Sequence, residues 1–316
     1  MTSVSVVVPT RGGARTLPLL LTSLREQTHP DWEAVVVVDG DVDGSADLVA
    51  REARDLPVRT LVLPENRGRS AALNAGFSLA EGDVLVRSDD DLGFGPAHLA
   101  RHAAHHEAAA APIGLVGLCR NVYPDGGSYA RAYGVPTDAR FRAAAYAAPA
   151  DRTWRYWAAN VSVTSETWRT IGPYDESYRA YGWEDVDWGY RLRRAGIPVE
   201  IHADVEAEHH GAAATTEDRA LRAFYSGAAR QHFLRTHDLG DGAALLGDTG
   251  AGDGLWGRAV LSVAAITDER RLRRLGDVVD RINRALPRPA AEKLVALLVE
   301  GAAVAGHRAG RTAGAI

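Results

Sequence analysis

The sequence predicts an α/β protein with a mostly parallel central sheet, followed by a helical C-terminal region. Two observations carry this prediction. In the first two thirds of the chain, short runs of valine, isoleucine and leucine alternate with stretches of helical periodicity, as in the crossover units that build parallel sheets. After His210-Gly211 the apolar residues recur at helical spacing alone. We therefore expect an α/β domain over residues 1–212 and a helical region over residues 213–316.

The expected elements follow one another regularly through the first part of the chain. Short apolar runs predict strands, because residues that are buried on both faces of a parallel sheet need no alternation. These runs are residues 4–8, 34–38, 58–63, 84–86 and 113–118. Helices are expected between them, beginning near Thr16, Ser45, Ala72 and Pro96, with Thr16 and Ser45 as N-caps.

From residue 120 to residue 150 this regularity stops. The segment is rich in glycine, alanine, tyrosine and proline, and we expect an irregular connection that acts as a functional loop or a mobile flap. Beyond it, strands are predicted over residues 158–164 and 199–201 and helices over residues 165–171 and 184–195. In the C-terminal region, helices are predicted from Thr216 onward and over residues 255–266, 268–285 and 289–305.

Composition excludes several classes of protein. The 316 residues carry a formal net charge of −5, which argues against binding nucleic acid or a membrane surface through bulk charge. Cys119 is the single cysteine, so an intrachain disulfide or a cysteine-based metal site is excluded, and a reducing cytoplasm fits best. No signal peptide is expected, and the apolar stretch over residues 290–306 is too short and too charged to span a bilayer.

The sharpest polar feature is the run Ser88-Asp89-Asp90-Asp91, directly after a predicted strand. Adjacent carboxylates repel one another, so such a run needs a cation or hydrogen-bond donors nearby. Oxygen ligands of this kind suit Mg²⁺ or Mn²⁺, which commonly bridge carboxylates to substrate phosphates. The alternative is a solvated acidic turn ahead of the helix that begins at Pro96.

A second cluster, Trp183-Glu184-Asp185-Val186-Asp187, lies at the start of a predicted helix. Carboxylates in a first turn stabilise the helix through its dipole, and that alone explains many such clusters. A carboxylate held there also suits a general base, and the preceding Tyr181-Gly182-Trp183 supplies an aromatic surface of the kind that stacks on sugar rings. Both interpretations stay open at this point.

Paired histidines occur twice. Glu208-His209-His210-Gly211 follows a strand, where an imidazole suits a transition metal, but the side chains of neighbouring strand residues diverge and cannot share one ion. His105-His106 lies on an alanine-rich helix with no carboxylate cluster nearby in the sequence, and we interpret this pair as surface residues.

The motifs follow an order that is typical of one family. They are Ser5-Val6-Val7-Val8-Pro9-Thr10, the strand ending at Asp39, the segment 66–76, the aspartate run, Asn160-Val161-Ser162, Gly172-Pro173-Tyr174-Asp175-Glu176, Glu184-Asp185-Val186-Asp187 and Arg191-Leu192. Over about residues 3–212, this series resembles the family 2 glycosyltransferases, which have the GT-A fold. Residues 160–210 further resemble the galactosyltransferase-like C-terminal half of that family.

The resemblance implies a role for each matching residue. Pro9, Thr10, Arg11, Asp39, Asn66 and Arg69 would line the nucleotide pocket, with Asp39 accepting a hydrogen bond from the base. Asp89, Asp90 and Asp91 match the DxD motif, in which Asp89 touches the ribose or sugar and Asp91 binds the divalent ion. His209, rather than His210, would complete the metal site. Asp185 matches the catalytic base, and Glu184 and Trp183 would shape the donor-sugar or acceptor pocket.

Two positions depart from the family pattern. Family members often carry Asp-Asp-Gly-Ser after the second strand, whereas this chain reads Asp39-Gly40-Asp41-Val42-Asp43-Gly44-Ser45, so Asp41 or Asp43 would replace a usual contact. Arg87 stands two residues before the DxD motif, where the family usually has an apolar residue.

The implied activity is metal-dependent, inverting transfer of a sugar from a nucleoside diphosphate to an acceptor hydroxyl or amine. The donor would be UDP-, GDP- or dTDP-linked, and the acceptor a small molecule, a lipid-linked molecule or a glycan. The C-terminal helices would pack on the catalytic domain, form a homodimer or contact an acceptor. At its reference pKa of about 3.9, Asp185 would be a weak base that acts late in the reaction. The alternatives are a sugar-phosphate nucleotidyltransferase, for which Arg11-Gly12-Gly13-Ala14-Arg15 is a partial phosphate-loop match, and a non-catalytic nucleotide-sugar or glycan-binding protein.

Overall fold

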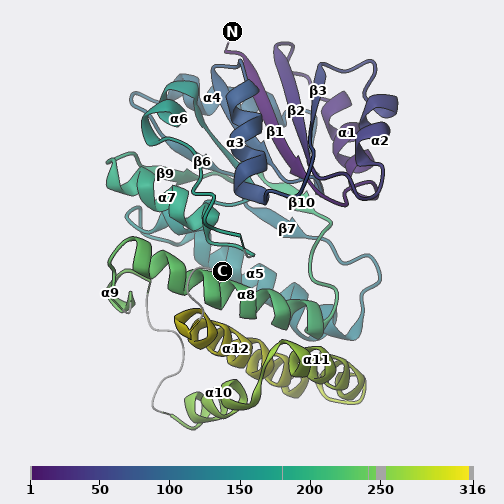
Figure 1. Cartoon of the computed structure of the whole chain (residues 1–316), viewed down its shortest axis with the longest axis vertical. Helices are drawn as coiled ribbons and strands as arrows, with labels where there is room; N and C mark the ends of the chain where they lie inside the picture. Colours follow the sequence, from purple (N-terminus) through teal and green to yellow (C-terminus); the bar gives the residue numbers. More distant parts are fainter. Residues whose placement is uncertain (1, 180, 241, 247–253, 313–316) are drawn as a thin grey trace. The chain divides into compact units, whose positions relative to one another are not determined.

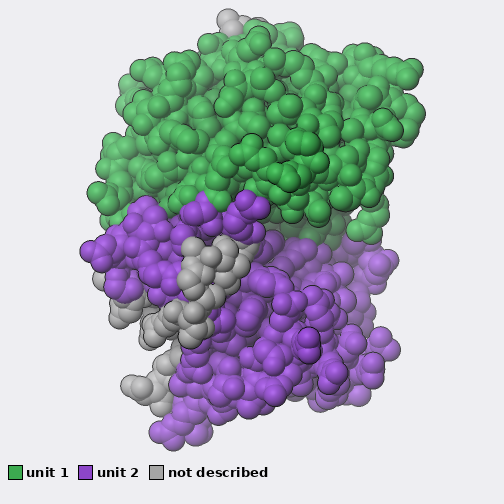
Figure 2. Space-filling view, in the orientation of Figure 1, with its two compact units in different colours: residues 1–122, 141–176, 184–211 green, residues 123–140, 177–183, 212–316 purple. Residues whose placement is uncertain are grey.

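The computed structural model describes residues 2–179, 181–240, 242–246 and 254–312. Figure 2 shows the chain divided into two compact units. Unit 1 comprises residues 1–122, 141–176 and 184–211, and unit 2 comprises residues 123–140, 177–183 and 212–316. The segments 123–140 and 177–183 thus belong to unit 2, although the sequence places them inside the first predicted domain. The division at residue 212 into an α/β domain and a helical region stays a prediction.

Unit 1 is built on a mostly parallel sheet, which confirms the predicted fold class (Figure 1). Within the described residues the strand order is β3-β2-β1-β4-β8-β6-β9. The β4–β8 and β6–β8 pairs are antiparallel, and the other pairs are parallel. The strands are β1 (Val4–Thr10), β2 (Trp32–Asp39), β3 (Val58–Leu63), β4 (Val84–Ser88), β6 (Gly114–Val116), β8 (Asn160–Thr164) and β9 (Val199–Ile201).

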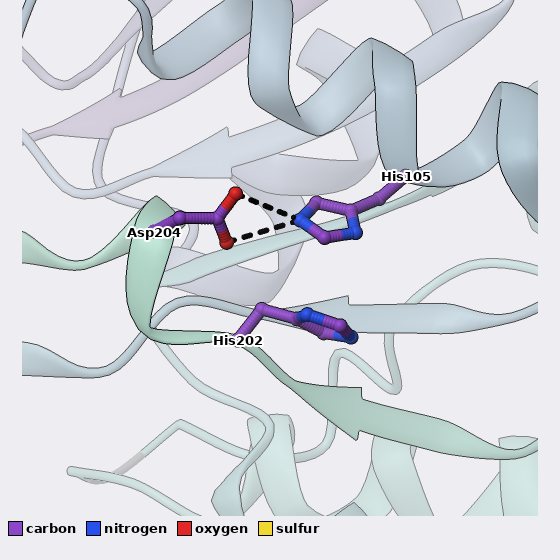
Figure 3. A group of neighbouring side chains, drawn as sticks. All are labelled: His105, His202 and Asp204. Atoms are coloured by element: carbon purple, nitrogen blue, oxygen red, sulfur yellow. Dashed lines mark hydrogen bonds and ion pairs between the residues drawn. The ribbon is translucent and has the colours of Figure 1, made fainter.

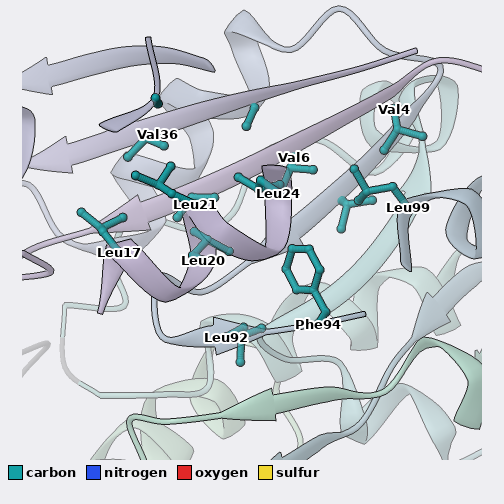
Figure 4. Close-up of a cluster of buried hydrophobic side chains, with 14 of the residues drawn as sticks. Val4, Val6, Leu17, Leu20, Leu21, Leu24, Val36, Leu92, Phe94 and Leu99 are labelled. Carbon is teal, nitrogen blue, oxygen red and sulfur yellow. The ribbon is translucent and has the colours of Figure 1, made fainter. Parts of the chain in front are cut away.

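The apolar strands are buried because helices cover the sheet. Helix α1 (Leu17–Arg25) places its leucines against the valines of β1 and β2, and Figure 4 shows Leu20, Leu21 and Leu24 in this core with Val6 and Val36. Thr16 is the N-cap residue of α1, as expected, but its side chain makes no capping hydrogen bond. The other helices of the unit are α2 (Ser45–Glu52), α3 (Arg69–Leu79), α4 (His98–Ala108), α6 (Ser165–Ile171) and α7 (Glu184–Arg194).

Helix α4 carries a row of histidines that faces the sheet. His98, His102 and His106 recur every four residues, and therefore lie on one side of the helix. His98 Nε2 lies 3.2 Å from Asn160 Oδ1, and both His102 Nδ1 and His106 Nε2 lie 2.8 Å from Ser162 Oγ on β8. Burial lowers the pKa of His98 and of His106 to about 4, and it also lowers the pKa of His102 well below its usual value.

A second, smaller sheet was not predicted. Within the described residues it has the order β5-β10-β7, from strands β5 (Leu92–Gly93), β10 (Ala207–His209) and β7 (Cys119–Asn121). Strands of two or three residues leave no periodicity to detect in a sequence. The sheet nevertheless matters for the site, because it sets His209 opposite Leu92 on one side and opposite Asn121 on the other.

The expected irregular connection over residues 120–150 is wrong. The chain there forms a π-helical turn (η1, Ala130–Gly134) that continues into α5 (Val135–Tyr146). Alanine, the best helix former, outweighs the glycines: Gly126 and Gly127 lie before the helical part, and Gly134 lies within it. Tyr129 and Tyr133, four residues apart, are buried in a cluster of unit 2, so tertiary packing stabilises the turn.

Unit 2 is helical in its described part, which confirms the predicted C-terminal region. Its longest helices, α8 (Thr216–Thr236) and α12 (Arg288–Thr312), lie against each other. Glycine permits this contact, since a Cβ on Gly306 would lie 1.8 Å from the carbonyl oxygen of Phe224. The other helices are α9 (Ala243–Leu246), α10 (Leu255–Ile266) and α11 (Glu269–Asn283). Among the residues that can be described, no helix is both long and apolar enough to cross a membrane.

Candidate active site

The predicted nucleotide residues of unit 1 follow the carboxyl ends of four neighbouring strands, β3, β2, β1 and β4, the edge at which α/β sheets bind ligands. Pro9 and Thr10 are buried at the end of β1, and Arg11 follows as an exposed residue. Thr10 Oγ1 donates a hydrogen bond to Asp90 Oδ2, which ties the end of β1 to the aspartate run. Burial raises the pKa of Asp90 to about 6.

Asp39, at the end of β2, organises the loop before α3. Its two carboxylate oxygens accept hydrogen bonds from the backbone N–H groups of Arg67, at 2.6 Å, and Gly68, at 2.8 Å. Asn66 is exposed and its Oδ1 accepts from Gly68 N–H at 3.1 Å. Asp39 therefore shapes the loop that carries Asn66, and the base contact that the resemblance implies stays a prediction.

The two aspartates of the altered loop stabilise the start of α2. Asp41 Oδ1 accepts from the N–H groups of Gly44 and Ser45, and its Oδ2 accepts from that of Ala46. Asp43 accepts from Ser45 and from Ala14 N–H. Ser45 is the first helical residue rather than the predicted N-cap, since Gly44 occupies the N-cap with a φ of 79°. The departure from the family motif thus builds a cap.

Asp91 and His209 come together as a candidate metal centre. The distance between Asp91 Oδ2 and His209 Nε2 is 3.3 Å, and the Oδ1 of Asp91 is buried without a hydrogen-bond partner. His209 Nδ1 lies 2.6 Å from Asn121 Oδ1. This contact fixes the orientation of the imidazole ring, and its Nε2 atom faces Asp91. A histidine that ligates a metal is commonly oriented in this way.

The donor set therefore fits a divalent ion such as Mn²⁺ or Mg²⁺. It combines an unpartnered carboxylate oxygen with an imidazole nitrogen that is already oriented. Gly211 keeps the site open, because a Cβ there would lie 1.7 Å from Asp91 Oδ2. His210 points elsewhere, with its Nε2 3.3 Å from Glu208 Oε2.

Arg87 contacts several candidate site residues, although the sequence suggested no role for it. Its side chain is 1% exposed and extends from β4 into a group of acids. It forms an ion pair with Asp185, donates from Nε and Nη2 to Asp89 Oδ1 at 3.3 and 3.2 Å, and lies 3.8 Å from Glu184 Oε1. The guanidinium also stands over the ring of Tyr174, 5.7 Å from its centroid.

The acids in the first turn of α7 make two kinds of contact, one within the helix and one with other elements. Asp187 Oδ2 accepts from Arg191 Nε at 3.1 Å within the same helix, as a purely structural residue would. Glu184 and Asp185 instead contact residues of other elements, and Glu184 Oε1 lies 3.3 Å from Arg69 Nη1. Dipole stabilisation alone does not require these contacts.

Two arginines, Arg69 and Arg87, face three carboxylates, those of Asp89, Glu184 and Asp185. The pKa of Asp89 tends to rise on burial, but Arg87 and Arg69 outweigh that effect and lower it. For Asp185, burial dominates over the opposing charge of Arg87 and raises the pKa to about 7. Asp185 is thus a stronger base than its reference pKa suggests.

Trp183 immediately precedes these acids in the chain but belongs to unit 2. It has a φ of 72°, its Nε1 donates to Ser226 Oγ at 3.0 Å, and its ring packs on Phe233. It lines a cavity of about 500 Å³ in that unit together with Tyr133, Arg219 and Arg230. Its predicted role in binding sugar or acceptor is left as a prediction.

The residues that the sequence missed left different signals. Arg87 is visible as a charged residue inside an apolar strand, a position that demands a counter-charge. Asn121 gave no signal, because it is recognisable only once β7 pairs with β10. Nothing in the sequence connects Tyr174 to Arg87.

Comparison with known families is consistent with this geometry. A family model described as glycosyl transferase family 2 matches residues 5–167. A second model, described as the N-terminal domain of galactosyltransferase, matches residues 139–210. The resemblance seen in the sequence is thereby confirmed.

Curated relatives share part of this chain. A validoxylamine A glucosyltransferase of Streptomyces hygroscopicus subsp. jinggangensis is 29% identical over 237 residues, which cover 65% of this chain and 55% of the relative. An undecaprenyl-phosphate 4-deoxy-4-formamido-L-arabinose transferase of Pseudomonas fluorescens is 36% identical over 119 residues, covering 36% of this chain and 35% of the relative. At the first of these matches, the chain spans about half the length of its relative.

Solved structures share the fold. The mannosyltransferase PcManGT from Pyrobaculum calidifontis, in complex with GDP-Man and Mn²⁺, has a TM-score of 0.60 at 18% identity, covering 95% of this chain and 86% of that one. TarS 1–349 of S. aureus, in complex with UDP-GlcNAc, has a TM-score of 0.52 at 16% identity, covering 98% and 92%. With a family model matched over more than half of its length, the chain belongs to glycosyl transferase family 2.

Proposed function

We propose that the chain transfers a sugar, with inversion, from a nucleoside-diphosphate sugar to an acceptor hydroxyl or amine. The observation that carries the proposal is that Asp89, Glu184 and Asp185 lie around Arg87. Two residues after Asp89 in the chain, Asp91 pairs with His209. A site of this kind offers a general base and a cation site for a diphosphate. Membership of family 2 supports the reaction class.

Asp91 and His209 would hold a Mn²⁺ or Mg²⁺ ion, with Asn121 orienting the imidazole. When bound, such an ion offsets the charge that develops on a leaving diphosphate. The structural neighbour with GDP-Man and Mn²⁺ supports this assignment at the level of the fold.

Asp185 would accept the proton of the acceptor as the new glycosidic bond forms. A pKa near 7 suits this task, because a base works best when its pKa lies near the operating pH. Arg87 holds the carboxylate in place by an ion pair from the buried strand β4, and Arg69 does the same for Glu184. Thr10 fixes Asp90, so that the neighbouring Asp89 and Asp91 face the donor.

The donor class rests on the family match. Pro9, Thr10, Arg11, Asp39, Asn66 and Arg69 would line the nucleotide pocket, and we propose a UDP-, GDP- or dTDP-linked sugar as the donor. The names of the relatives mention validoxylamine A and undecaprenyl phosphate, which suggests a small molecule or a lipid-linked molecule as the acceptor of this chain. A glycan is the third candidate.

The experiment compares Asp185→Asn with the wild-type chain. Transfer should fall by about three orders of magnitude or more, because the base is lost, while calorimetry shows donor binding within a few-fold of wild type. Asp187→Asn is the matched control on the same turn, and it should keep most of the transfer activity. Near-normal turnover of Asp185→Asn would contradict the assignment.

The same assay separates the two alternatives. Release of a nucleoside diphosphate on transfer supports the proposal. Release of pyrophosphate from a nucleoside triphosphate and a sugar phosphate identifies a nucleotidyltransferase instead. Tight donor binding without any product identifies a binding protein.

We further propose that the C-terminal helices form a homodimer interface. Leu255, Leu261 and Ile266 on α10 are exposed apolar residues that a second copy would cover. Sedimentation equilibrium measures the assembly state, and a monomer that persists at high micromolar concentration contradicts the proposal.

A further inference from the structure

A group of potential metal ligands in unit 1 has no part in the transfer proposed above. It consists of His105 on the last turns of α4, His202 just after β9, and Asp204 in the short 3₁₀ turn that follows (η3, Ala203–Val205). Figure 3 shows these side chains facing one another from separate elements. From the sequence, His105-His106 were interpreted as surface residues because no carboxylate cluster lies nearby in the chain, yet folding brings Asp204 to His105.

The geometry is close to that of a metal site. His105 Nε2 lies 3.0 and 3.1 Å from the two carboxylate oxygens of Asp204. The rings of His105 and His202 have centroids 4.1 Å apart. One ligand atom from each residue lies within 4.8 Å of the other two, and closure by about 1 Å would reach the spacing of ligands around one ion.

Neighbouring residues support the ligands from outside. His202 Nε2 lies 3.0 Å from Glu200 Oε2, so its Nδ1 is the nitrogen left to face an ion. A carboxylate on the far nitrogen commonly orients a ligating histidine. Arg101 Nη1 donates to the backbone oxygen of Asp204 and thereby fixes the turn.

We propose that His105, His202 and Asp204 bind a Zn²⁺ ion, with water as the fourth ligand. Two imidazoles and one carboxylate match the chemistry of zinc, whereas Mg²⁺ prefers oxygen ligands alone. The side chain of Asp204 is 47% exposed and that of His202 is 35% exposed, so an ion and its water can enter from solvent.

The site would fix one segment of unit 1. Zn²⁺ would join the end of α4 to the chain between β9 and β10, where Asp204 precedes His209 by five residues. The ion would thus restrain the strand that carries the predicted catalytic ligand without touching it. Zinc binding is nevertheless independent of the proposed transfer and can be tested without an activity assay.

The test uses full-length protein with Asp91→Asn and His209→Ala, which remove the other predicted metal site. Equilibrium dialysis with metal analysis should find one Zn²⁺ per chain at micromolar zinc. Adding His202→Ala should weaken binding at least a hundredfold, and adding His237→Ala, a partly buried histidine of unit 2, should leave it unchanged. No bound zinc in the parent, or equal binding in the His202→Ala variant, overturns the proposal.

A second measurement avoids the multiple variants. Co²⁺ bound to the wild-type chain in a tetrahedral N₂O₂ environment gives strong visible absorption, whereas octahedral Co²⁺ absorbs weakly. His105→Gln, which removes one ligand while keeping an amide near Asp204, should abolish the strong band. A band that survives in His105→Gln, in protein with wild-type circular dichroism, contradicts the assignment.

Discussion

Arg87 stands on a buried strand among three acids, and its environment explains a charged residue where an apolar one is usual. Removing it would leave Asp89, Glu184 and Asp185 with Arg69 as the one remaining cation of this group in the described structure. An uncompensated buried charge is costly, whereas the intact pair contributes little net stability. Arg87 is therefore a positioning residue whose loss should be visible in both stability and acid–base behaviour.

We predict that Arg87→Leu lowers the free energy of unfolding by about 3–5 kcal/mol. Urea unfolding at pH 8, where the acids are charged, measures this. Leu85→Ala, at another buried position of β4, is a control that creates a cavity without unpairing a charge. A loss in Arg87→Leu that does not diminish as the pH is lowered would show that the effect is packing rather than charge.

The pKa of Asp185 predicts the pH dependence of transfer. Because burial raises that pKa to about 7, the carboxylate is mostly protonated at pH 6, and kcat/KM should rise about tenfold per pH unit below pH 7 and level off above it. Arg87→Lys keeps the charge and should change the profile little. A flat profile from pH 5 to pH 8 contradicts Asp185 as the base.

Gly211 offers a test of the metal centre. A Cβ at this position meets Asp91 Oδ2, so Gly211→Ala should displace the carboxylate and weaken Mn²⁺ binding by about tenfold or more, measured by calorimetry. Gly95→Ala is the control, since a Cβ there meets open space. Unchanged affinity in Gly211→Ala would remove Asp91 from the ligand set.

Single residues show which contacts a sequence can suggest. Asp91 and His209 were chosen by their motif positions, and the structure brings them within 3.3 Å of each other. Asn121 and Tyr174 were out of reach, because their contacts arise from strand pairing and packing between segments far apart in the chain. Asp185 was chosen as the candidate base from its motif position alone. Its raised pKa could not be predicted, because the pKa depends on burial in the folded structure.

Elements were predictable in proportion to their length and regularity. The valine-rich strands β1 and β2 follow from composition alone, whereas β5, β7 and β10 are too short to leave a pattern. The helix over residues 135–146 was hidden by nearby glycine and proline. His106 was interpreted as a surface residue, but its Nε2 lies against Ser162 on β8, which no local pattern reveals.

Helix α4 makes unit 1 sensitive to acid. His98 and His106 have pKa values of about 4 when folded and about 6.5 when unfolded, so the unfolded chain binds more protons between these values. Stability is therefore full above pH 6.5 and falls by about 1.4 kcal/mol per pH unit for each histidine below it.

Urea unfolding at pH 7, 6 and 5 measures this dependence. His106→Gln keeps a hydrogen-bonding group near Ser162 but does not titrate. The substitution should therefore reduce the change in unfolding free energy per pH unit by the contribution of one histidine. An unchanged slope would contradict the assignment to α4, and His237→Ala serves as the control histidine.

At the scale of the whole molecule, the chain enters unit 2 before unit 1 is complete. Residues 123–140 and 177–183 belong to unit 2 although unit 1 ends at residue 211. The fold class, the order of the main elements and the helical end were predicted, but this interleaving was not, because a sequence shows neighbours along the chain rather than contacts between distant segments.

Truncation after residue 212 should therefore fail as a way to isolate a catalytic domain. The fragment would keep Tyr129 and Tyr133 but lose the residues of α8, α11 and α12 that bury them. We expect it to bind a hydrophobic dye and to elute as aggregates in size-exclusion chromatography. A monodisperse, dye-negative fragment that binds donor as the full chain does would contradict this expectation.

The same interleaving has a consequence during synthesis on the ribosome. Tyr129 and Tyr133 leave the exit tunnel well before α11 and α12, which complete their burial, have been translated. At about 5–20 residues per second, this delay lasts on the order of ten seconds or more. For that time the nascent chain presents the unburied rings of Tyr129 and Tyr133 to its surroundings, and we expect chaperones that hold emerging chains to bind it.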